Sequence, residues 1–202
     1  MGRPKSYDEE EVLKKAMLQF WQTGFAETSL SDLEAATSLN RYSLYKGFGD
    51  KETLFEKALE YYQRYIIGRM LEPLTQADPS IEAIKAYFIQ LNILLKGKFG
   101  NYGCLFQNSQ KEGISQNTLV KQYAVNLWLQ QHELFSACLD DSHCQLPFEK
   151  EHGIQLLLAQ SQSQISLARS NSPTKVLDAQ RASIIALLDS WSPESLPITS
   201  IN

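Results

Sequence analysis

Apolar residues recur every three or four positions along most of this chain, which is the spacing of one face of an α-helix. The first such stripe comprises Val12, Leu13, Ala16, Met17 and Phe20. Asp8 stands where an N-cap is expected, and Gly24 follows where a helix would end. No stretch alternates apolar and polar residues with the period of two that is typical of strands. The pattern therefore predicts an all-α protein.

Residues 28–55 predict two short helices joined by a tight turn, with a third helix starting directly afterwards. Ser29 caps the first helix, and Asp32 lies at capping-box spacing. Asn40 caps the second helix, whose Leu44 and Phe48 point inward and leave a polar outer face. The major groove of B-DNA admits a helix of this kind, so the pattern favours a DNA-binding protein.

Further helices are predicted along the rest of the chain. Asp50 caps a long one that runs from about residue 51 to 71, and Pro73 and the Asp78-Pro79 pair mark its end and a linker. Later helices are expected over residues 81–96, 104–111, 117–139, 148–168 and 175–191. We interpret residues 1–50 as a helix-turn-helix DNA-binding domain with a basic N-terminal arm, and residues 51–202 as a helical regulatory and dimerisation domain.

Composition narrows the class of protein. The chain has 202 residues, of which 43% are hydrophobic, and a net charge of −4. It contains no apolar run long enough to span a membrane, and the charged start MGRPKSYDEEE does not resemble a signal peptide. Three cysteines are too few for a disulfide scaffold. A cytoplasmic location is therefore expected, with no cofactor.

The segment from 28 to 54 also resembles the DNA-binding segment of the TetR (tetracycline-repressor-like) family. The resemblance is carried by Thr28, Ser29, Leu30, Leu33, Ala36, Leu39, Leu44, Tyr45, Phe48, Lys51, Glu52 and Leu54. Two positions depart from the family pattern: Ser38 stands where glycine is common, and Tyr42 is unusually bulky. The resemblance implies a homodimeric repressor that binds a palindromic double-stranded operator and is released by a small-molecule or reactive-electrophile inducer.

The predicted DNA contacts follow from residue type and position. Arg41 and Ser43 are expected at base edges, because arginine favours guanine O6 and N7. Arg3 and Lys5 are expected in the minor groove, and Glu34 is expected to point away from DNA. The other predicted contacts, mainly to phosphates, are Thr28, Ser29, Asn40, Tyr42, Tyr45, Lys46 and Lys51. The alternative for each charged residue is a solvated surface side chain.

The last two helices carry the predicted dimer interface, by resemblance to the family. Each has a broad apolar or small-residue stripe, which is equally consistent with packing inside one chain. The residues assigned to a four-helix bundle between two subunits are Ile154, Leu158, Ser161, Ile165, Ile184, Leu187, Leu188 and Trp191.

The second domain also suggests a ligand site. The aromatic or thiol side chains predicted to line a small-molecule pocket are Tyr65, Phe88, Phe99, Cys104, Phe106, Tyr123 and Trp128. Gln90, Asn92 and Gln107 would supply polar contacts. Packing in an ordinary core explains the same pattern equally well.

Cys104 is a candidate sensor thiol for reactive electrophiles. It follows Gly103 at the expected start of a short helix, where a helix N-terminus can lower the pKa of a thiol. A Gly-Cys-Leu segment here also resembles one in part of the TetR family. The alternative, which we favour, is that Cys104 is a small buried apolar residue.

Other readings of the chain have weaker support. His132, Cys138, His143, Cys144 and His152 are soft ligand types, but their spacing matches no compact zinc motif, so no metal is assigned and a metal-responsive regulator is a minor alternative. A helical adaptor that binds protein instead of DNA is another. An enzyme is disfavoured, because the chain lacks a nucleophile-elbow motif and a phosphate-binding glycine loop.

Overall fold

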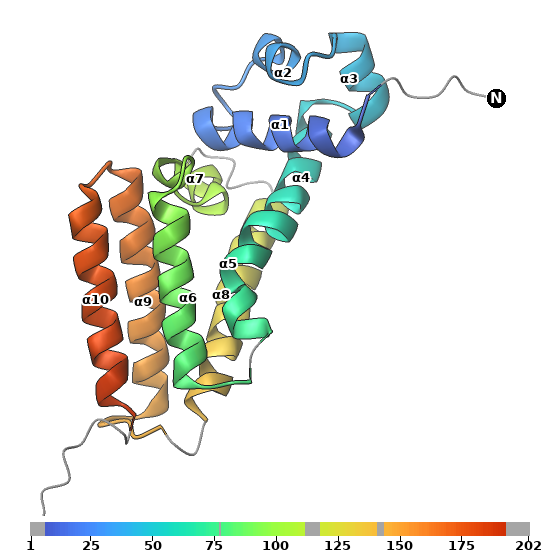
Figure 1. The fold of residues 1–202 in the computed structure, drawn as a ribbon. Coiled ribbons are helices and arrows are strands. Elements are labelled where there is room, and N and C mark those ends of the chain that lie inside the picture. The colour runs from blue at the N-terminus through green and yellow to red at the C-terminus, as the bar shows by residue number, and fades with distance from the viewer. Residues whose placement is uncertain (1–6, 77, 112–117, 141–143, 193–202) are drawn as a thin grey trace, which may run out of the picture. The chain divides into compact units, whose positions relative to one another are not determined.

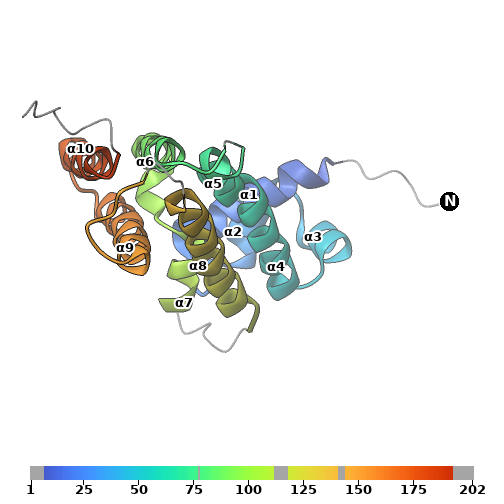
Figure 2. The same ribbon diagram turned by 90° about the horizontal axis from the view of Figure 1, so that it is seen from below.

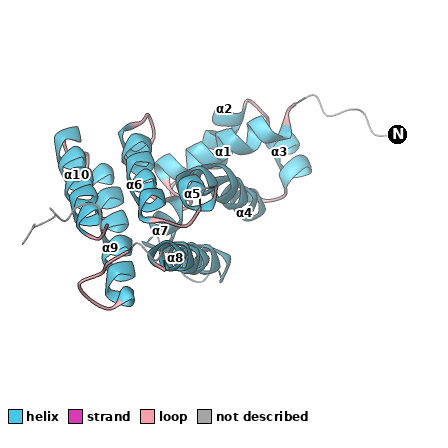
Figure 3. Ribbon diagram, turned by 60° about the horizontal axis from the view of Figure 1, so that its bottom comes forward, coloured by secondary structure: helices cyan, strands magenta, loops and turns pink. Residues whose placement is uncertain are grey.

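A computed structural model describes residues 7–76, 78–111, 118–140 and 144–192. All regular structure in these residues is helical, which confirms the predicted all-α class (Figures 1 and 3). The elements are α1 (Glu9–Thr23), α2 (Leu30–Thr37), α3 (Arg41–Phe48), α4 (Lys51–Tyr62), η1 (Gln63–Ile67), α5 (Gly68–Thr75), α6 (Ile81–Lys96), η2 (Gly100–Tyr102), α7 (Leu105–Lys111), α8 (Thr118–Leu139), α9 (Lys150–Arg169) and α10 (Thr174–Ser190). No helix in the described part is both long and apolar enough to cross a membrane.

The chain folds as two compact units. The first comprises Met1–Arg69 and Cys104–Val125, and the second comprises Met70–Gly103 and Asn126–Asn202. The first unit therefore contains α1 to α4, which we call the head. The second contains α6, α9 and α10. The predicted boundary after residue 50 separates two functions, and it stays a prediction.

Side-chain caps begin the helices of the head at the residues that the sequence indicates. Asp8 accepts hydrogen bonds from the backbone N–H groups of Glu10 and Glu11, and Gly24 ends α1 with a φ of 89°. Asp50 caps α4 by accepting from the N–H of Thr53 at 2.8 Å. Each cap satisfies donors that a helix end leaves without intrahelical partners. The borders of these helices are thus encoded locally.

Aromatic rings fill the core of the head. Phe20 and Phe55 pack edge to face with centroids 5.0 Å apart, and Phe25 lies 4.8 Å from Phe55. Leu33 from α2 and Phe48 from α3 are also buried. Because both short helices place an apolar residue in this core, their opposite faces are left to solvent.

The helix that follows the head differs from the prediction in length and regularity. The predicted single helix to about residue 71 is divided into α4, the π-helical η1 and α5, and it continues to Thr75. Pro73 lies inside α5 and does not end the helix. A proline so close to the end removes one backbone donor while most of the helix keeps its hydrogen bonds. The prediction for Pro73 was therefore wrong.

Three helices of the second unit, α6, α9 and α10, lie side by side (Figures 1 and 2). Two ion pairs fix the antiparallel register of α6 and α10: Lys85 contacts Asp189 at 2.6 Å, and Lys96 contacts Asp178 at 3.0 Å. The side-chain amide of Gln180 on α10 donates to the Ser163 hydroxyl on α9 at 3.0 Å, which fixes the register of these two helices. The three helices therefore share one internal seam.

The Gly100→Ala variant is expected to lose about 2–3 kcal/mol of unfolding free energy. A Cβ atom at residue 100 would lie 1.7 Å from the backbone oxygen of Leu95, so the backbone itself must move. Thermal or urea unfolding of the purified variant measures the loss. Gly68→Ala is the control, because the nearest atom to its Cβ is 3.8 Å away and alanine favours a helix. Equal stability of the two variants would contradict the prediction.

Candidate DNA-binding interface

The turn between α2 and α3 adopts a left-handed conformation at a residue that is not glycine. Ser38 ends α2 with φ 61° and ψ 22°, at the position where the family pattern has glycine. Residues with a Cβ are disfavoured in this region, so the turn stores strain. Thr37 stabilises the end of α2, because its hydroxyl donates to the carbonyl oxygen of Leu33 at 2.6 Å. The turn thus fixes the direction in which α3 leaves α2.

The Ser38→Gly variant is expected to unfold with a free energy about 0.5–1 kcal/mol higher than that of the wild-type protein. Glycine removes the strain of the left-handed conformation, and the extra freedom of the unfolded chain offsets part of the gain. Chemical denaturation provides the measurement. Ser38→Val should have the opposite sign, because a β-branched side chain fits this conformation poorly. A destabilised glycine variant would show that the serine side chain contributes more than its strain costs.

Two side chains satisfy the N-terminus of α3. The Asn40 side-chain oxygen accepts from the N–H of Ser43 at 2.9 Å, so the predicted cap is confirmed. The carboxylate of Glu34 accepts from the backbone N–H of Arg41. That Glu34 points away from DNA stays a prediction. The hydrogen bond links the last turn of α2 to the first residue of α3.

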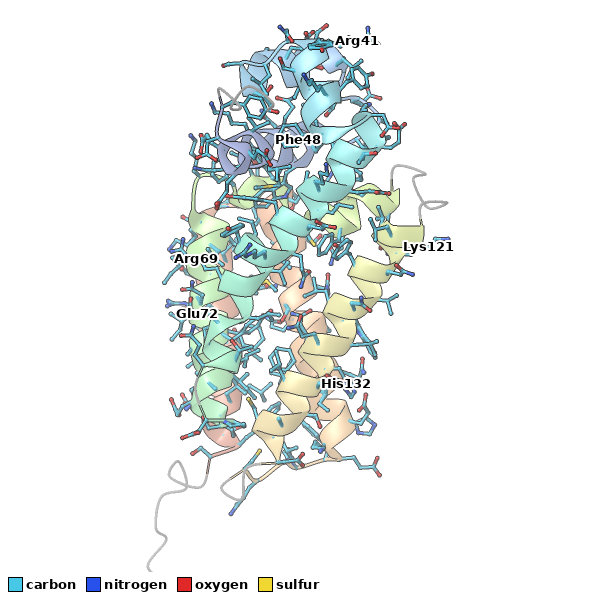
Figure 4. All side chains as sticks on the ribbon, turned by 90° about the vertical axis from the view of Figure 1, so that its right-hand side faces the viewer. Arg41, Phe48, Arg69, Glu72, Lys121 and His132 are labelled. Carbon is cyan, nitrogen blue, oxygen red and sulfur yellow. The ribbon has the colours of Figure 1, made fainter. Side chains whose placement is uncertain are left out.

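The outer face of α3 combines cationic and aromatic side chains. Arg41 and Lys46 are exposed, and Tyr42 is 72% exposed. The Arg41 guanidinium carbon lies 5.4 Å from the centroid of the Tyr45 ring, and Lys46 Nζ lies 5.7 Å from that of Tyr42. Figure 4 shows Arg41 at the outer edge of the head and Phe48 within it. We call the face formed by Arg41, Tyr42, Tyr45, Lys46 and the half-buried Ser43 the reading face.

The two elements that flank α3 also place polar groups at the surface of the head. Lys51 occupies the first position of α4, with Nζ 4.4 Å from the centroid of the Phe25 ring. Ser29 is exposed and forms the predicted capping box with Asp32, whose carboxylate accepts from both the hydroxyl and the N–H of Ser29. These hydrogen bonds lower the pKa of Asp32, so a negative charge is held at the start of α2.

One predicted contact does not reach this surface, and two others lie outside the described residues. Thr28 is fully buried, and its hydroxyl donates to the carbonyl of Gly24 and lies 2.6 Å from the hydroxyl of Thr23. The structure therefore corrects the prediction that Thr28 holds a phosphate: its hydroxyl closes the loop before α2. Arg3 and Lys5 lie outside the described residues.

The environment of Cys104 contradicts a thiol activated by a helix N-terminus. Cys104 is only 4% exposed, and burial raises the pKa of its thiol. Tyr62 is hydrogen-bonded to this thiol, and burial raises the pKa of Tyr62 as well. Because the thiolate is the reactive species, a raised pKa disfavours reaction with electrophiles. The favoured alternative, a small buried core residue, agrees with this geometry.

The side chains predicted to line a ligand pocket are divided between the two units. Tyr65, Cys104, Phe106 and Tyr123 belong to the first, where the rings of Phe106 and Tyr123 stack at 5.1 Å. Phe88, Phe99 and Trp128 belong to the second, where Phe88 packs in the aromatic core and Trp128 is 42% exposed. The pocket formed by these residues remains a prediction.

The histidine and cysteine residues considered as metal ligands have other roles where they are described. His132 Nε2 lies 3.0 Å from the Glu151 carboxylate, whose pKa is lowered by hydrogen bonds from Gln155 and His132. Cys138 is buried, and His143 lies outside the described residues. Within the described ranges, no group of three or more His, Cys, Asp or Glu side chains is arranged to hold a metal ion.

Most of the predicted dimer residues face the interior of the second unit. Seven of the eight are buried within the single chain, namely Ile154, Leu158, Ser161, Ile165, Ile184, Leu188 and Trp191. Trp191, for example, packs edge to face on Phe148 at 5.6 Å. These seven side chains offer little surface to a second chain, so their assignment to the dimer interface stays a prediction that the burial does not favour. Leu187 is half exposed and is the exception.

Comparison with known proteins relates the chain to one family. Residues 12–58, which span α1 to most of α4, match the model of the bacterial regulatory proteins of the tetR family. The chain is 35% identical over 130 residues to the HTH-type transcriptional repressor ComR of Escherichia coli K12, and 31% identical over 123 residues to the uncharacterised HTH-type regulator YezE of Bacillus subtilis 168. The chain is therefore similar to regulators of the TetR family. Each match covers 61% of this chain and 62% of ComR or 63% of YezE, so the chain spans about three fifths of these relatives.

Solved structures of TetR-family regulators share this fold. A cysteine mutant of the regulator CifR in complex with 26-bp operator DNA covers 96% of the chain with a TM-score of 0.75 and 21% identity, and all of that chain is matched. A regulator from Chloroflexus aurantiacus covers 91% of the chain, with 94% of its own length matched, a TM-score of 0.77 and 20% identity. These solved structures show that the chain has the fold of TetR-family regulators.

Proposed function

We propose that this protein is a homodimeric transcriptional repressor of the TetR family that binds a palindromic operator through α3 and is released by a small-molecule inducer. The observation that carries the proposal is the reading face, where Arg41, Tyr42, Ser43, Tyr45 and Lys46 surround a short helix anchored by buried Leu44 and Phe48. A helix of this length fits the major groove with its polar side toward the bases. ComR and BdcR, which are named repressors, support the direction of regulation.

Each side chain has a role that its chemistry supports. Arg41 and Ser43 would contact base edges, since a guanidinium pairs with guanine O6 and N7. Tyr42, with most of its ring exposed, would contact a thymine methyl group or a sugar. Tyr45, Lys46, Lys51, Ser29 and Asn40 would contact phosphates. Arg3 and Lys5 would follow the adjacent minor groove, where basic arms bind.

A dimer is required because one eight-residue helix reads too few base pairs for specificity. We assign its interface to the outward side of α9 and α10, opposite the buried faces. The apolar or small side chains that are exposed or half exposed there are Leu156, Ala159, Ser163 and Leu167 on α9, and Val176, Ala179, Ser183, Ala186 and Leu187 on α10. Small residues allow two helix pairs to approach closely and form a four-helix bundle around a two-fold axis.

The two predicted domains would have different roles. Residues 1–50 would bind DNA, and residues 51–202 would dimerise and receive the inducer. The inducer would act by binding more tightly to a state of the dimer whose two reading helices no longer fit successive major grooves.

A gel-shift titration on the DNA upstream of the gene tests the proposal. The expected result is a discrete complex that forms at least 1,000-fold more tightly than complexes with random DNA of equal length, roughly the lower limit for specific regulators. The logarithm of the binding constant should fall linearly with the logarithm of salt concentration, because bound phosphates release counterions. Equal affinity for the upstream and the random duplex at every salt concentration would overturn the proposal.

A further inference from the structure

The interior of the second unit contains hydrogen-bonding groups that the described residues do not satisfy. Gln164 on α9 is fully buried, and neither its side-chain nitrogen nor its side-chain oxygen has a partner. Asn92 on α6 is 3% exposed, and its side-chain nitrogen has no partner. Arg181 on α10 has a buried Nε, also without a partner. Buried polar groups are nearly always hydrogen-bonded, so these three side chains require a cause, as does the unpartnered indole Nε1 of Trp191 in the same unit.

The helix registers bring these three side chains to one level of the seam between α6, α9 and α10. Gln180 and Ser163 are hydrogen-bonded, and they immediately precede Arg181 and Gln164. Lys96 on α6 forms an ion pair with Asp178 on α10, and the two helices are antiparallel. Asn92 lies four residues before Lys96, so it stands at the level of the residues that follow Asp178. Arg181 is one of them.

The positions of Arg181 and Gln164 around their helices also place them on the buried side. On α10, Arg181 lies between Leu177 and Ile184 along the buried stripe. On α9, Gln164 follows buried Ser161 by one turn and precedes buried Ala168 by one turn. The three unpartnered groups therefore converge on the same interior seam.

The chemistry of the cluster indicates a particular ligand class. Asn92 Nδ2, Gln164 Nε2 and Arg181 Nε are all donors, and the guanidinium carries a permanent positive charge. Donors that converge around a guanidinium suit a carboxylate, which accepts several charge-assisted hydrogen bonds. Gln164 Oε1 is the one unpartnered acceptor among the three side chains, and it suits a hydroxyl on the same ligand.

A neighbouring polar cluster differs because its groups satisfy one another. The Gln131 amide donates to the Tyr87 hydroxyl at 2.8 Å, the Tyr87 hydroxyl donates to Ser161 Oγ at 3.2 Å, and the Ser161 hydroxyl donates to the Leu157 carbonyl at 2.9 Å. Buried polar side chains in this unit can therefore satisfy one another by hydrogen bonding. On the seam with Gln164, by contrast, the amide and guanidinium groups of Asn92, Gln164 and Arg181 lack such partners.

We propose that Asn92, Gln164 and Arg181 form a buried binding site for a small hydroxycarboxylate. Arg181 and the two amide nitrogens bind the carboxylate, and Gln164 Oε1 accepts from the ligand hydroxyl. The site rests on the proposed function only where its occupancy is linked to operator release. Binding itself is measured without DNA, so failure of the site and failure of the repressor function are distinguishable.

Calorimetric titration of the full chain with lactate, propionate and lactamide tests the site. Lactate should bind saturably and raise the melting temperature. Propionate should bind about tenfold more weakly, because it lacks the hydroxyl, and neutral lactamide should not bind measurably. Absence of saturable binding by both carboxylates, or equal binding of lactate and lactamide, overturns the site.

Variants locate the binding. Arg181→Met keeps most of the aliphatic stem, and Gln164→Glu keeps the shape while it opposes an anion, so each should weaken lactate binding at least about tenfold. Gln130→Glu, at an exposed position of α8, is the matched control and should bind as the wild-type protein does. Lactate affinity that is the same in all three variants overturns the assignment.

A measurement on the wild-type chain tests the site without relying on variants, which could fail to fold. In protein labelled with nitrogen-15, lactate should shift the side-chain NH₂ signals of Gln164 and Asn92, whereas the signal of exposed Gln130 should stay in place. Signals of Gln164 and Asn92 that remain unchanged at saturating lactate also overturn the proposal.

Discussion

The Arg41→Ala variant is expected to bind the operator roughly 30- to 20,000-fold more weakly than the wild-type protein. A bidentate contact between arginine and guanine contributes about 1–3 kcal/mol to discrimination, and a palindromic operator contains the contact twice. The Arg41 side chain is exposed at the first residue of α3, so its removal leaves the packing of the head intact. Fluorescence anisotropy with labelled operator DNA at fixed salt measures the change.

The pattern of weakening distinguishes base contacts from phosphate contacts. Arg41→Ala should relax the preference at one base pair of each half-site and leave affinity for random DNA nearly unchanged. Lys51→Ala should weaken binding to all sequences alike and reduce the salt slope by about one for each phosphate that the lysine neutralises. Arg69→Ala, which removes an exposed arginine from α5, is the control (Figure 4). Uniform weakening across sequences for Arg41→Ala would reassign that residue to the backbone.

Features that depend on neighbours in the sequence could be predicted from it. Ser29, Asn40 and Asp50 each cap a helix by accepting from the backbone N–H three residues further along, as their spacing indicates. The buried positions Leu44 and Phe48 follow from helical periodicity alone. These features fix the reading face, because a cap sets where a helix begins and the apolar stripe sets which side faces inward.

Features that depend on which element covers a helix face could not be predicted from the sequence. On α9, Ser161 and Ser163 are both small and polar, yet Ser161 is fully buried beside Tyr87 and Ser163 lies at the half-exposed contact with Gln180. Periodicity groups residues by face, but it does not say whether the same chain or a second one covers that face. The residues predicted for the dimer therefore belong, with the exception of Leu187, to the inward side of α9 and α10.

Two side-chain contacts of the head also could not be predicted from the sequence. Glu34 was assigned by its charge, whereas its carboxylate reaches the N–H of Arg41 seven residues away. Thr28 matched the family pattern for a DNA contact, whereas its hydroxyl bonds back to Gly24. In each case the side chain is hydrogen-bonded to a nearby backbone group, which residue type alone does not indicate.

The Ala179→Arg variant is expected to be monomeric and to bind the operator at least about 100-fold more weakly than the wild-type protein. Ala179 is exposed on the outward side of α10 that we assign to the dimer. A four-helix interface with small residues at its centre leaves no room for an arginine, and two such charges related by the two-fold axis repel each other. The affinity falls because a monomer binds one half-site and loses the gain of simultaneous engagement. Sedimentation equilibrium gives the mass, and anisotropy gives the affinity.

A matched substitution separates the interface from a general effect of added charge. Ala86→Arg makes the same change at an exposed alanine of α6, which lies outside the proposed interface, and should leave both the mass and the affinity at wild-type values. The buried face offers a second comparison: Leu188→Ala should lower the free energy of unfolding by about 2–4 kcal/mol and leave the surviving folded protein dimeric, because Leu188 contributes to the core of the subunit. A dimeric Ala179→Arg protein would refute the outward face as the interface, since no close helix pairing could accommodate that side chain.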